Sequence, residues 1–277
     1  HVNACDTGGP SSKHGVWIDE VAELGRRAGA LGMRPCMLHA HIGSGPQFQE
    51  LVDNLARLAE DFGELAAAFP QLEAVSLGGG IPHDYRGGAA PVDAQRLREL
   101  FVAARRDLGR RAGRELRLEI EPGRFLTAAA GVLVTAVHDV KSTRSNPKGD
   151  GATFAMVDAG FVDLARPAMY GAFHRISVVG RENADTLQPY VVAGPLCESG
   201  DVFTRDADEL LVPRELPAVA RGDLLCLHDA GAYGYAMSSN YNSLGRAPQL
   251  WLEEDGGVEL VSRRETIDDI VRAEEPA

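Results

Sequence analysis

The feature that most constrains the fold is an alternation of short apolar runs and amphipathic helices in the first half of the chain. Four apolar runs have the length and composition of buried parallel strands, and they occupy residues 2–5, 36–41, 74–77 and 116–120. Apolar residues at steps of three and four predict helices over 49–69 and 93–109, and a weaker helix over 18–31. The alternation predicts successive β/α units built around a parallel sheet.

The last three of these runs end in glycine or polar residues. The endings are HIGSG at 41–45, three glycines at 78–80 and EPGR at 121–124. His41 and Gly78 lie 37 residues apart, and Gly78 and Glu121 lie 43 residues apart, close to one β/α unit each. In a (β/α)8 barrel of roughly 250 residues the strand C-termini carry the chemistry. Since only about four units fit before Arg124, the pattern indicates either a small open α/β sheet or part of a barrel whose other half precedes His1.

The pattern changes after Ala130 to short β-like runs separated by turns. These runs are rich in Val, Leu and aromatic residues and occupy 131–137, 153–157, 190–192, 210–212, 224–227 and 258–261. A polar loop is expected over 142–151 and a hairpin turn over 255–257. The sequence therefore predicts an α/β unit over residues 1–128, either the open sheet or the C-terminal half of a barrel, and a separate β domain over 129–277.

Composition narrows the classes of partner. With 28 Lys and Arg against 40 Asp and Glu, the net charge is −12, which repels nucleic-acid phosphates and anionic lipid alike. No apolar run approaches the roughly 18 residues that span a bilayer. The four cysteines show no metal-binding or disulfide spacing, which favours a reducing cytoplasm.

The polar strand endings predict an anion site. The Ser44 hydroxyl, its flanking glycine amides and the amides of Gly78, Gly79 and Gly80 have the make-up of a phosphate nest. The alternative interpretation is that the three glycines only form a tight strand-to-helix turn, because glycine adopts positive φ without a steric clash.

Three further residues at these endings leave alternatives open. His39 and His41 alternate on a strand, so both face one side, where they would bind a metal, contact a planar ligand or make a core hydrogen bond. Glu121 needs a cationic partner there, which is either Arg124 in a structural ion pair or the protonated ring nitrogen of a ligand. Ligands for a metal do not cluster nearby in the sequence, so no metal site is predicted.

Three loops of the second half are unusually rich in Cys, Glu, Arg, Tyr and Asn. Together with the endings above they form six motifs, in the order HIGSG, the glycine triplet, EPGR, DAGFVDLARPAMYG (158–171), GPLCESGD (194–201) and AGAYGYAMSSNYNS (230–243). In this order they resemble the diaminopimelate decarboxylase family, which belongs to the fold-type III pyridoxal-phosphate decarboxylases. The resemblance runs from Asn3 to about Thr266.

The resemblance implies a partial TIM-type barrel followed by a β domain, as in alanine racemase and ornithine decarboxylase, and a homodimer with a shared active site. It also implies decarboxylation of meso-2,6-diaminopimelate to L-lysine and CO2, the last step of lysine biosynthesis. The protonated pyridoxal-phosphate ring acts as the electron sink in this reaction.

Individual roles follow from the same resemblance. His41 would stack on the ring, Ser44 and the glycines at 78–80 would bind the phosphate, and Glu121 would face the ring nitrogen. Tyr233 would reach both phosphate and substrate. Arg124, Arg166 and Tyr170 match positions that bind a substrate carboxylate. Cys197, as proton donor, and Glu198, as a substrate contact, match residues delivered across the dimer interface.

One departure from the family concerns the lysine that binds the cofactor covalently. The only lysines are Lys13, Lys141 and Lys148, and none stands in the motif that carries this role. The chain is therefore expected to be the C-terminal two-thirds of a longer protein, inactive as given. The rival interpretations are a related ornithine, lysine or arginine decarboxylase, a metal-dependent barrel hydrolase that uses His39 and His41, and a catalytically dead homologue.

Overall fold

The computed structural model describes residues 9–10, 12–41, 48–88, 92–147 and 149–275. The chain divides into two compact units, His1–Leu126 and Thr127–Ala277. The predicted strand at 2–5 and Ser44 lie outside the described residues.

The first unit is built on three parallel strands. In chain order its elements are η2 (Ile18–Glu20), α1 (Val21–Ala30), β1 (Met37–His39), α2 (Phe48–Leu65), η3 (Ala66–Ala68), β2 (Ala74–Ser76), α3 (Ala94–Ala112), β3 (Arg117–Glu119) and the short α4 (Gly123–Thr127), which ends just past the unit. The strand order is β1-β2-β3, with Leu38 opposite Val75 and Val75 opposite Leu118. The predicted parallel β/α arrangement is therefore present.

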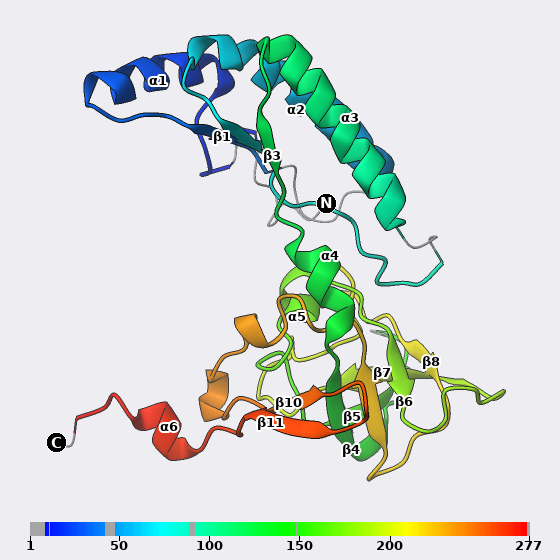
Figure 1. Cartoon of the computed structure of the whole chain (residues 1–277). Coiled ribbons are helices and arrows are strands. Elements are labelled where there is room, and N and C mark those ends of the chain that lie inside the picture. Colours follow the sequence, from blue (N-terminus) through cyan, green and yellow to red (C-terminus); the bar gives the residue numbers. More distant parts are fainter. Residues whose placement is uncertain (1–8, 11, 42–47, 89–91, 148, 276–277) are drawn as a thin grey trace. The chain divides into compact units, whose positions relative to one another are not determined.

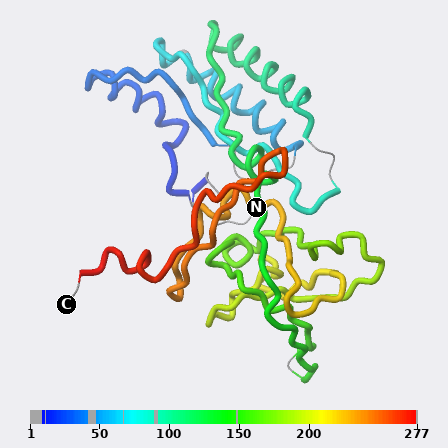
Figure 2. The backbone as a smooth tube through the Cα atoms, turned by 60° about the horizontal axis from the view of Figure 1, so that its bottom comes forward, coloured from blue at the N-terminus to red at the C-terminus, as the bar shows by residue number. Residues whose placement is uncertain are grey.

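Helices α2 and α3 lie side by side in both views of the backbone (Figures 1 and 2). The stripe predicted for α2 is buried at Leu51, Leu55 and Phe62, which share one core with Leu38 and Val75 of the sheet. Each fully buried leucine contributes about 2 kcal/mol by removing apolar surface from water. The helical period thus fixes which face of α2 joins the core.

Helix α3 has well-defined ends. The Asp93 carboxylate accepts hydrogen bonds from the backbone N–H groups of Gln95 and Arg96, a cap that stabilises a helix by about 1 kcal/mol. At the other end Gly113 adopts a left-handed conformation with φ 67°. These caps place the start of β3 four residues beyond the helix-ending glycine.

The second unit is dominated by a six-stranded sheet with the order β6-β9-β4-β5-β7-β8. Its strands are β4 (Leu133–Ser142), β5 (Thr153–Val157), β6 (Ile176–Val178), β7 (Gln188–Ala193), β8 (Arg214–Leu216) and β9 (Leu224–Leu227). A separate two-stranded hairpin, β10 (Gln249–Leu252) and β11 (Val258–Ser262), follows them in the sequence. Pairing is antiparallel except between β5 and β7. The helical segments are η4 (Ala128–Ala130), α5 (Arg166–Tyr170), η5 (Tyr235–Met237), η6 (Tyr241–Ser243) and α6 (Ile267–Val271).

One strand prediction was wrong. The run 210–212 makes only an isolated bridge, between Arg205 and Leu211, and its Leu210 is 63% exposed. An apolar run that stays in solvent lacks the buried face that a sheet position supplies, so its composition alone was misleading. The predicted turn at 255–257 is confirmed as the connection of β10 to β11.

Candidate active site

The carboxyl ends of β1, β2 and β3 meet at one edge of the parallel sheet. Backbone hydrogen bonds extend the ladder past each strand, from Ala40 N–H to Ser76 O (3.1 Å) and from Glu121 N–H to Gly78 O (2.8 Å). His41, Gly78 and Glu121 are therefore brought together although 80 residues separate the first from the last. The sequence prediction that these three endings form one site is consistent with this arrangement.

The Glu121 carboxylate is held by two side chains from the neighbouring strands. Its Oε1 lies 3.1 Å from His39 Nε2 and accepts a hydrogen bond from Ser76 Oγ at 3.2 Å. Glu121 therefore contacts His39 of β1, a partner that the sequence did not indicate. Since 54% of the Glu121 side chain is exposed, the carboxylate remains accessible to a ligand.

The His41 ring lies against the glycine triplet. Its Nδ1 accepts a hydrogen bond from the Gly79 backbone N–H at 3.2 Å. Burial lowers the pKa of His41, partly opposed by the nearby Glu121 carboxylate and reinforced by His39. The ring is therefore neutral at neutral pH.

Glycine is required at two positions between the strand ends. A Cβ on Gly78, whose φ is +64°, would lie 2.7 Å from the Ala40 carbonyl oxygen, and one on Gly79 would lie 2.8 Å from the Glu121 carbonyl oxygen. Gly80 has φ +95°, so positive φ alternates along the triplet in the manner of an anion nest. The N–H groups of Gly78 and Gly79 already donate to Ser76 Oγ and His41 Nδ1, and an anion bound there would exchange these bonds.

Arg124 follows this cluster on α4. Its guanidinium carbon lies 5.8 Å from the centre of the Tyr85 ring, and Tyr85 in turn contacts the His83 ring edge-on at 4.7 Å between ring centres. A cation over an aromatic face is held without losing its charge. His83 and Tyr85 were not predicted as site residues, although they follow the glycine triplet closely.

In the second unit, Arg166 and Tyr170 are the first and last residues of α5. Arg166 is 6% exposed, and its Nη1 lies 2.8 Å from Nε2 of the buried His174. Tyr170 is half-buried. His174 was not predicted as a site residue, because a lone histidine carries no signal of its partner.

Cys197 and Glu198 lie exposed on the loop between β7 and β8. The loop is anchored by Asp201, which is 3% exposed and accepts hydrogen bonds from the N–H groups of Phe161 (2.7 Å) and Leu196 (2.9 Å). Burial raises the pKa of Asp201. A Cβ on Gly194 would collide with this carboxylate, so the glycine leaves the space that Asp201 fills.

Tyr233 lies on the loop that follows β9. It has φ 58°, a left-handed conformation that non-glycine residues seldom adopt, and is 45% exposed. Such strain is often found at ligand-binding positions. The structure therefore presents the Tyr233 side chain to solvent from a constrained backbone.

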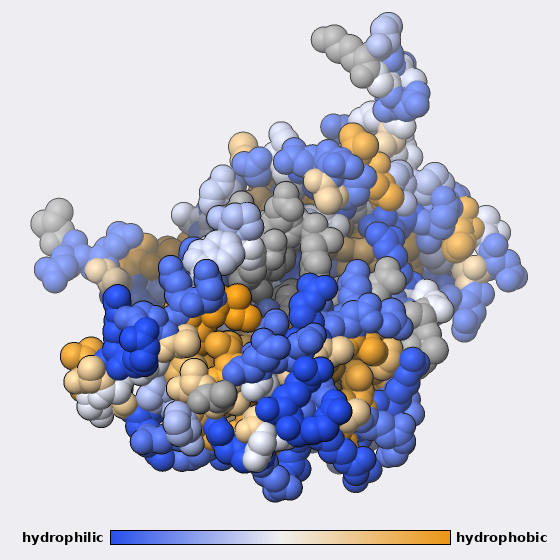
Figure 3. Space-filling model, turned by 90° about the horizontal axis from the view of Figure 1, so that it is seen from above, coloured by the Kyte–Doolittle hydropathy of each residue, from blue (hydrophilic) through white to orange (hydrophobic). Residues whose placement is uncertain are grey.

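Other kinds of site are not found in the described part of the chain. It contains no group of three or more His, Cys, Asp and Glu side chains placed to hold a metal ion. None of its helices is both long and apolar enough to cross a bilayer. On the face shown in Figure 3, hydrophilic residues predominate and apolar residues form separated groups.

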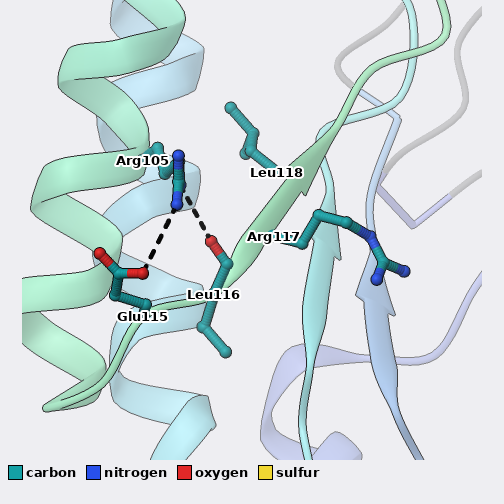
Figure 4. A pocket seen from close by; sticks show the side chains of 5 residues that line it. All are labelled: Arg105, Glu115, Leu116, Arg117 and Leu118. Carbon is teal, nitrogen blue, oxygen red and sulfur yellow. Dashed lines mark hydrogen bonds and ion pairs between the residues drawn. The ribbon is translucent and has the colours of Figure 1, made fainter.

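A shallow pocket of about 360 Å³ lies at the start of β3, at the opposite end of that strand from Glu121. Figure 4 shows Arg105 of α3 reaching toward Glu115 and the Leu116 carbonyl oxygen, which it contacts at 3.3 Å through Nε. Arg117 and Leu118 complete the lining. Its position at the amino end of the strand separates this pocket from the cluster of strand endings.

Comparison with known proteins gives consistent results. A diaminopimelate decarboxylase from Escherichia coli K12 is 42% identical over 282 residues, covering 99% of this chain and 64% of the relative, and one from Streptomyces coelicolor is 41% identical, covering 99% and 61%. A crystal structure of diaminopimelate decarboxylase has a TM-score of 0.87 at 40% identity and covers 99% of this chain and 64% of its own. The chain thus spans less than two-thirds of the length of these relatives.

The predicted fold class, a partial barrel followed by a β domain, is confirmed by this structural likeness. The lysine/ornithine decarboxylase from Vibrio vulnificus has the same fold, with a TM-score of 0.68 at 23% identity, covering 86% of this chain and 60% of its own. The family model described as "Pyridoxal-dependent decarboxylase, C-terminal sheet domain" matches residues 13–231. The chain belongs to the pyridoxal-dependent decarboxylase family.

Proposed function

We propose that the protein containing this chain decarboxylates meso-2,6-diaminopimelate to L-lysine and CO2 with pyridoxal phosphate, in the cytoplasm. Relatives that are 36–42% identical over 96–99% of the chain carry the name diaminopimelate decarboxylase. The structural observation that carries the proposal is the cluster of His41, Gly79 and Glu121 at three adjacent strand ends. A related structure from Helicobacter pylori, 29% identical with a TM-score of 0.79, is a complex with L-lysine, the product proposed here.

The residues at the strand ends fit the cofactor. Because Gly78 and Gly79 lack side chains, a ligand can approach the backbone beside the His41 ring. Ser44 and the amides of the triplet are proposed to bind the phosphate, and Tyr233 is proposed to contact the phosphate and the substrate. When bound, pyridoxal phosphate supplies an electron sink for the electron pair left by the departing CO2.

Glu121 is proposed to hold a proton on the ring nitrogen. Ser76 and His39 fix the direction of its carboxylate while half of the side chain stays exposed. A carboxylate that accepts a hydrogen bond from a protonated nitrogen stabilises the charge on that nitrogen. His41, neutral and fixed by Gly79, is proposed to pack its ring face against the cofactor ring.

Substrate recognition is assigned to Arg124, Arg166 and Tyr170. The reaction removes one carboxylate of diaminopimelate and leaves the other, so the one that remains needs cationic partners. Ornithine and lysine have no second carboxylate and gain nothing from these residues. The arginines therefore favour a dicarboxylate substrate over the basic amino acids.

Cys197 is proposed to deliver the proton that replaces CO2, and Glu198 to contact the substrate. Both lie exposed on a loop, as required if they serve the site of a second copy in a homodimer. The lysine that binds the cofactor covalently is proposed to lie outside these 277 residues, since Lys13, Lys141 and Lys148 do not match the family motif.

The substrate proposal is tested with protein expressed from its complete reading frame. We expect CO2 release from diaminopimelate with a kcat/KM roughly a hundredfold or more above that for ornithine or lysine. Equal use of ornithine or lysine would favour the broader basic-amino-acid decarboxylase. No CO2 release from protein loaded with cofactor would favour a catalytically dead homologue, and activity that depends on added metal would favour a hydrolase.

The role of Glu121 is tested separately. Glu121→Gln should retain the cofactor absorbance and lose turnover by roughly two orders of magnitude or more, because stabilising developing charge is a large catalytic term. Glu115→Gln, at an exposed position at the other end of β3, is the matched control. Near-normal turnover in Glu121→Gln would contradict the catalytic role and leave Glu121 with a structural one.

The shared site is tested by mixing two inactive variants, Cys197→Ala and Glu121→Gln. Random exchange of subunits makes half of the dimers mixed, and each mixed dimer regains one intact site. We expect about a quarter of the parent activity. No recovery after verified exchange would mean that each site is built within one chain.

A further inference from the structure

His174 is a buried histidine fixed by the sheet of the second unit. It is 2% exposed and lies two residues before β6, which pairs with β9 through Ile176 and Leu227. The His228 N–H donates to the Arg175 carbonyl oxygen at 2.9 Å and extends this pairing toward His174. The backbone next to His174 and the backbone next to His228 are thus both held by the pairing of β6 with β9.

The partners of the ring define its protonation state. Nδ1 lies 2.9 Å from the His228 carbonyl oxygen, which only accepts, so Nδ1 carries the proton. Nε2 lies 2.8 Å from Arg166 Nη1, which only donates, so Nε2 is the acceptor and has no proton. His174 is therefore a neutral imidazole with one fixed tautomer.

His174 gives Arg166 a fixed hydrogen-bond acceptor that carries no charge. The neutral imidazole accepts one N–H of the guanidinium and adds no negative charge beside it. Arg166 is 6% exposed, so its direction is set by such buried contacts rather than by solvent. A guanidinium held in one direction binds a carboxylate at lower entropic cost than a free one.

The side chain of His228 belongs to a different contact. Arg175 donates to its Nδ1, and its Nε2–H donates to Ser177 Oγ, both at 2.8 Å. Burial lowers the pKa of His228, so this ring is neutral at neutral pH as well. The hydrogen bond from His174 to residue 228 uses the backbone carbonyl oxygen and does not depend on the His228 ring.

We infer that His174 is a positioning residue that holds the Arg166 guanidinium in the orientation that binds the substrate carboxylate. This inference rests on the proposed function for the identity of that carboxylate. No carboxylate contact is assigned to His174 itself. Its effect on the reaction passes through Arg166.

Two substitutions separate the two hydrogen bonds of the ring. In His174→Asn the amide nitrogen replaces Nδ1 and still donates to the His228 carbonyl, but the acceptor that the ring gave Arg166 is lost. In His174→Gln the amide oxygen replaces Nε2 and still accepts from Arg166, while the bond to residue 228 is lost. His138→Asn, at an exposed position on β4, is the control for replacing a histidine elsewhere in the unit.

The variants are measured in the cofactor-loaded enzyme expressed from its complete reading frame. We expect His174→Asn to raise the KM for diaminopimelate roughly tenfold or more, the effect of losing a hydrogen bond to a charged group. His174→Gln and His138→Asn should stay within about threefold of the parent KM. In an Arg166→Ala background, the further effect of His174→Asn should shrink to less than about twofold, because the two residues act as one unit.

The outcomes distinguish this inference from the proposed function. An unchanged KM in Arg166→Ala would overturn the substrate assignment and the inference together. A raised KM in Arg166→Ala with an unchanged KM in His174→Asn, or the same fold-change for His174→Asn with and without Arg166, would overturn the inference alone. In ¹⁵N spectra at pH 7, a His174 ring protonated on both nitrogens or on Nε2 would also overturn it, independently of activity.

Discussion

Replacing Asp201 by Asn tests whether one buried carboxylate holds the loop that carries Cys197 and Glu198. The two carboxylate oxygens of Asp201 each accept a backbone N–H, one from Phe161 and one from Leu196. An asparagine offers only one oxygen, so its NH2 group must face one of these two donors. One hydrogen bond is lost and one buried N–H is left without an acceptor.

The expected cost follows from these contacts. Losing a buried hydrogen bond to a charged acceptor costs about 1.5–3 kcal/mol. For a protein of this size, each kcal/mol lowers Tm by about 2–4 °C, so Asp201→Asn should lower Tm by roughly 3–12 °C. The glycines at 160 and 194 pack against the same carboxylate and leave little room for the amide to turn away.

The assay is thermal unfolding of the parent and of Asp201→Asn, with Asp208→Asn as the matched control. Asp208 is exposed on the same connection, and its replacement should change stability by less than about 0.5 kcal/mol. Turnover of Asp201→Asn should also fall, since the loop with Cys197 loses its anchor. A Tm within about 1 °C of the parent would refute the reasoning, because two donors facing one oxygen cannot both be satisfied.

Two further predictions concern other parts of the chain. Gly79→Ala places a Cβ 2.8 Å from the Glu121 carbonyl oxygen, so it should lower the free energy of unfolding by about 1–3 kcal/mol and weaken cofactor binding. Gly29→Ala, in open space on α1, is the control and should not destabilise the protein in thermal unfolding. Hydrogen bonds from Arg246 lower the pKa of Glu265 from 4.5 to about 2, so its stabilising contribution is present above pH 4.5 and lost as the pH falls toward 2. Glu265→Gln should flatten the dependence of Tm on pH in that window, and an unchanged slope would contradict the assignment.

The parallel strands and their polar endings were predictable because their signals are local. A helical stripe, a strand-length apolar run and a terminal glycine are each visible within about twenty residues, and parallel pairing then brings the endings to one edge. The close approach at Gly79 follows from the same logic, since only glycine fits between two strand ends. For Glu121, the sequence correctly indicated a position just past the carboxyl end of a parallel strand.

The partners of the site residues were not predictable in the same way. The contact of Glu121 with His39 depends on the register between β1 and β3, which do not pair directly and are separated by β2. The contact of His174 with Arg166 joins a residue just before β6 to the start of α5, eight residues earlier, and nothing local distinguishes this histidine from one in solvent. Register and burial are properties of the assembled sheet, so the sequence named the charged residue in each pair but not its acceptor or donor.

The two units use different physical means to hold their candidate residues. In the first unit the strand endings are held by backbone proximity, and the glycines at 78 and 79 set the spacing between His41 and Glu121. In the second unit the loops are held by buried polar side chains, His174 and Asp201, whose partners include backbone groups. Substitutions that add a methyl group should therefore act mainly on the cofactor residues of the first unit, whereas substitutions that swap a donor for an acceptor should act mainly on the substrate residues of the second.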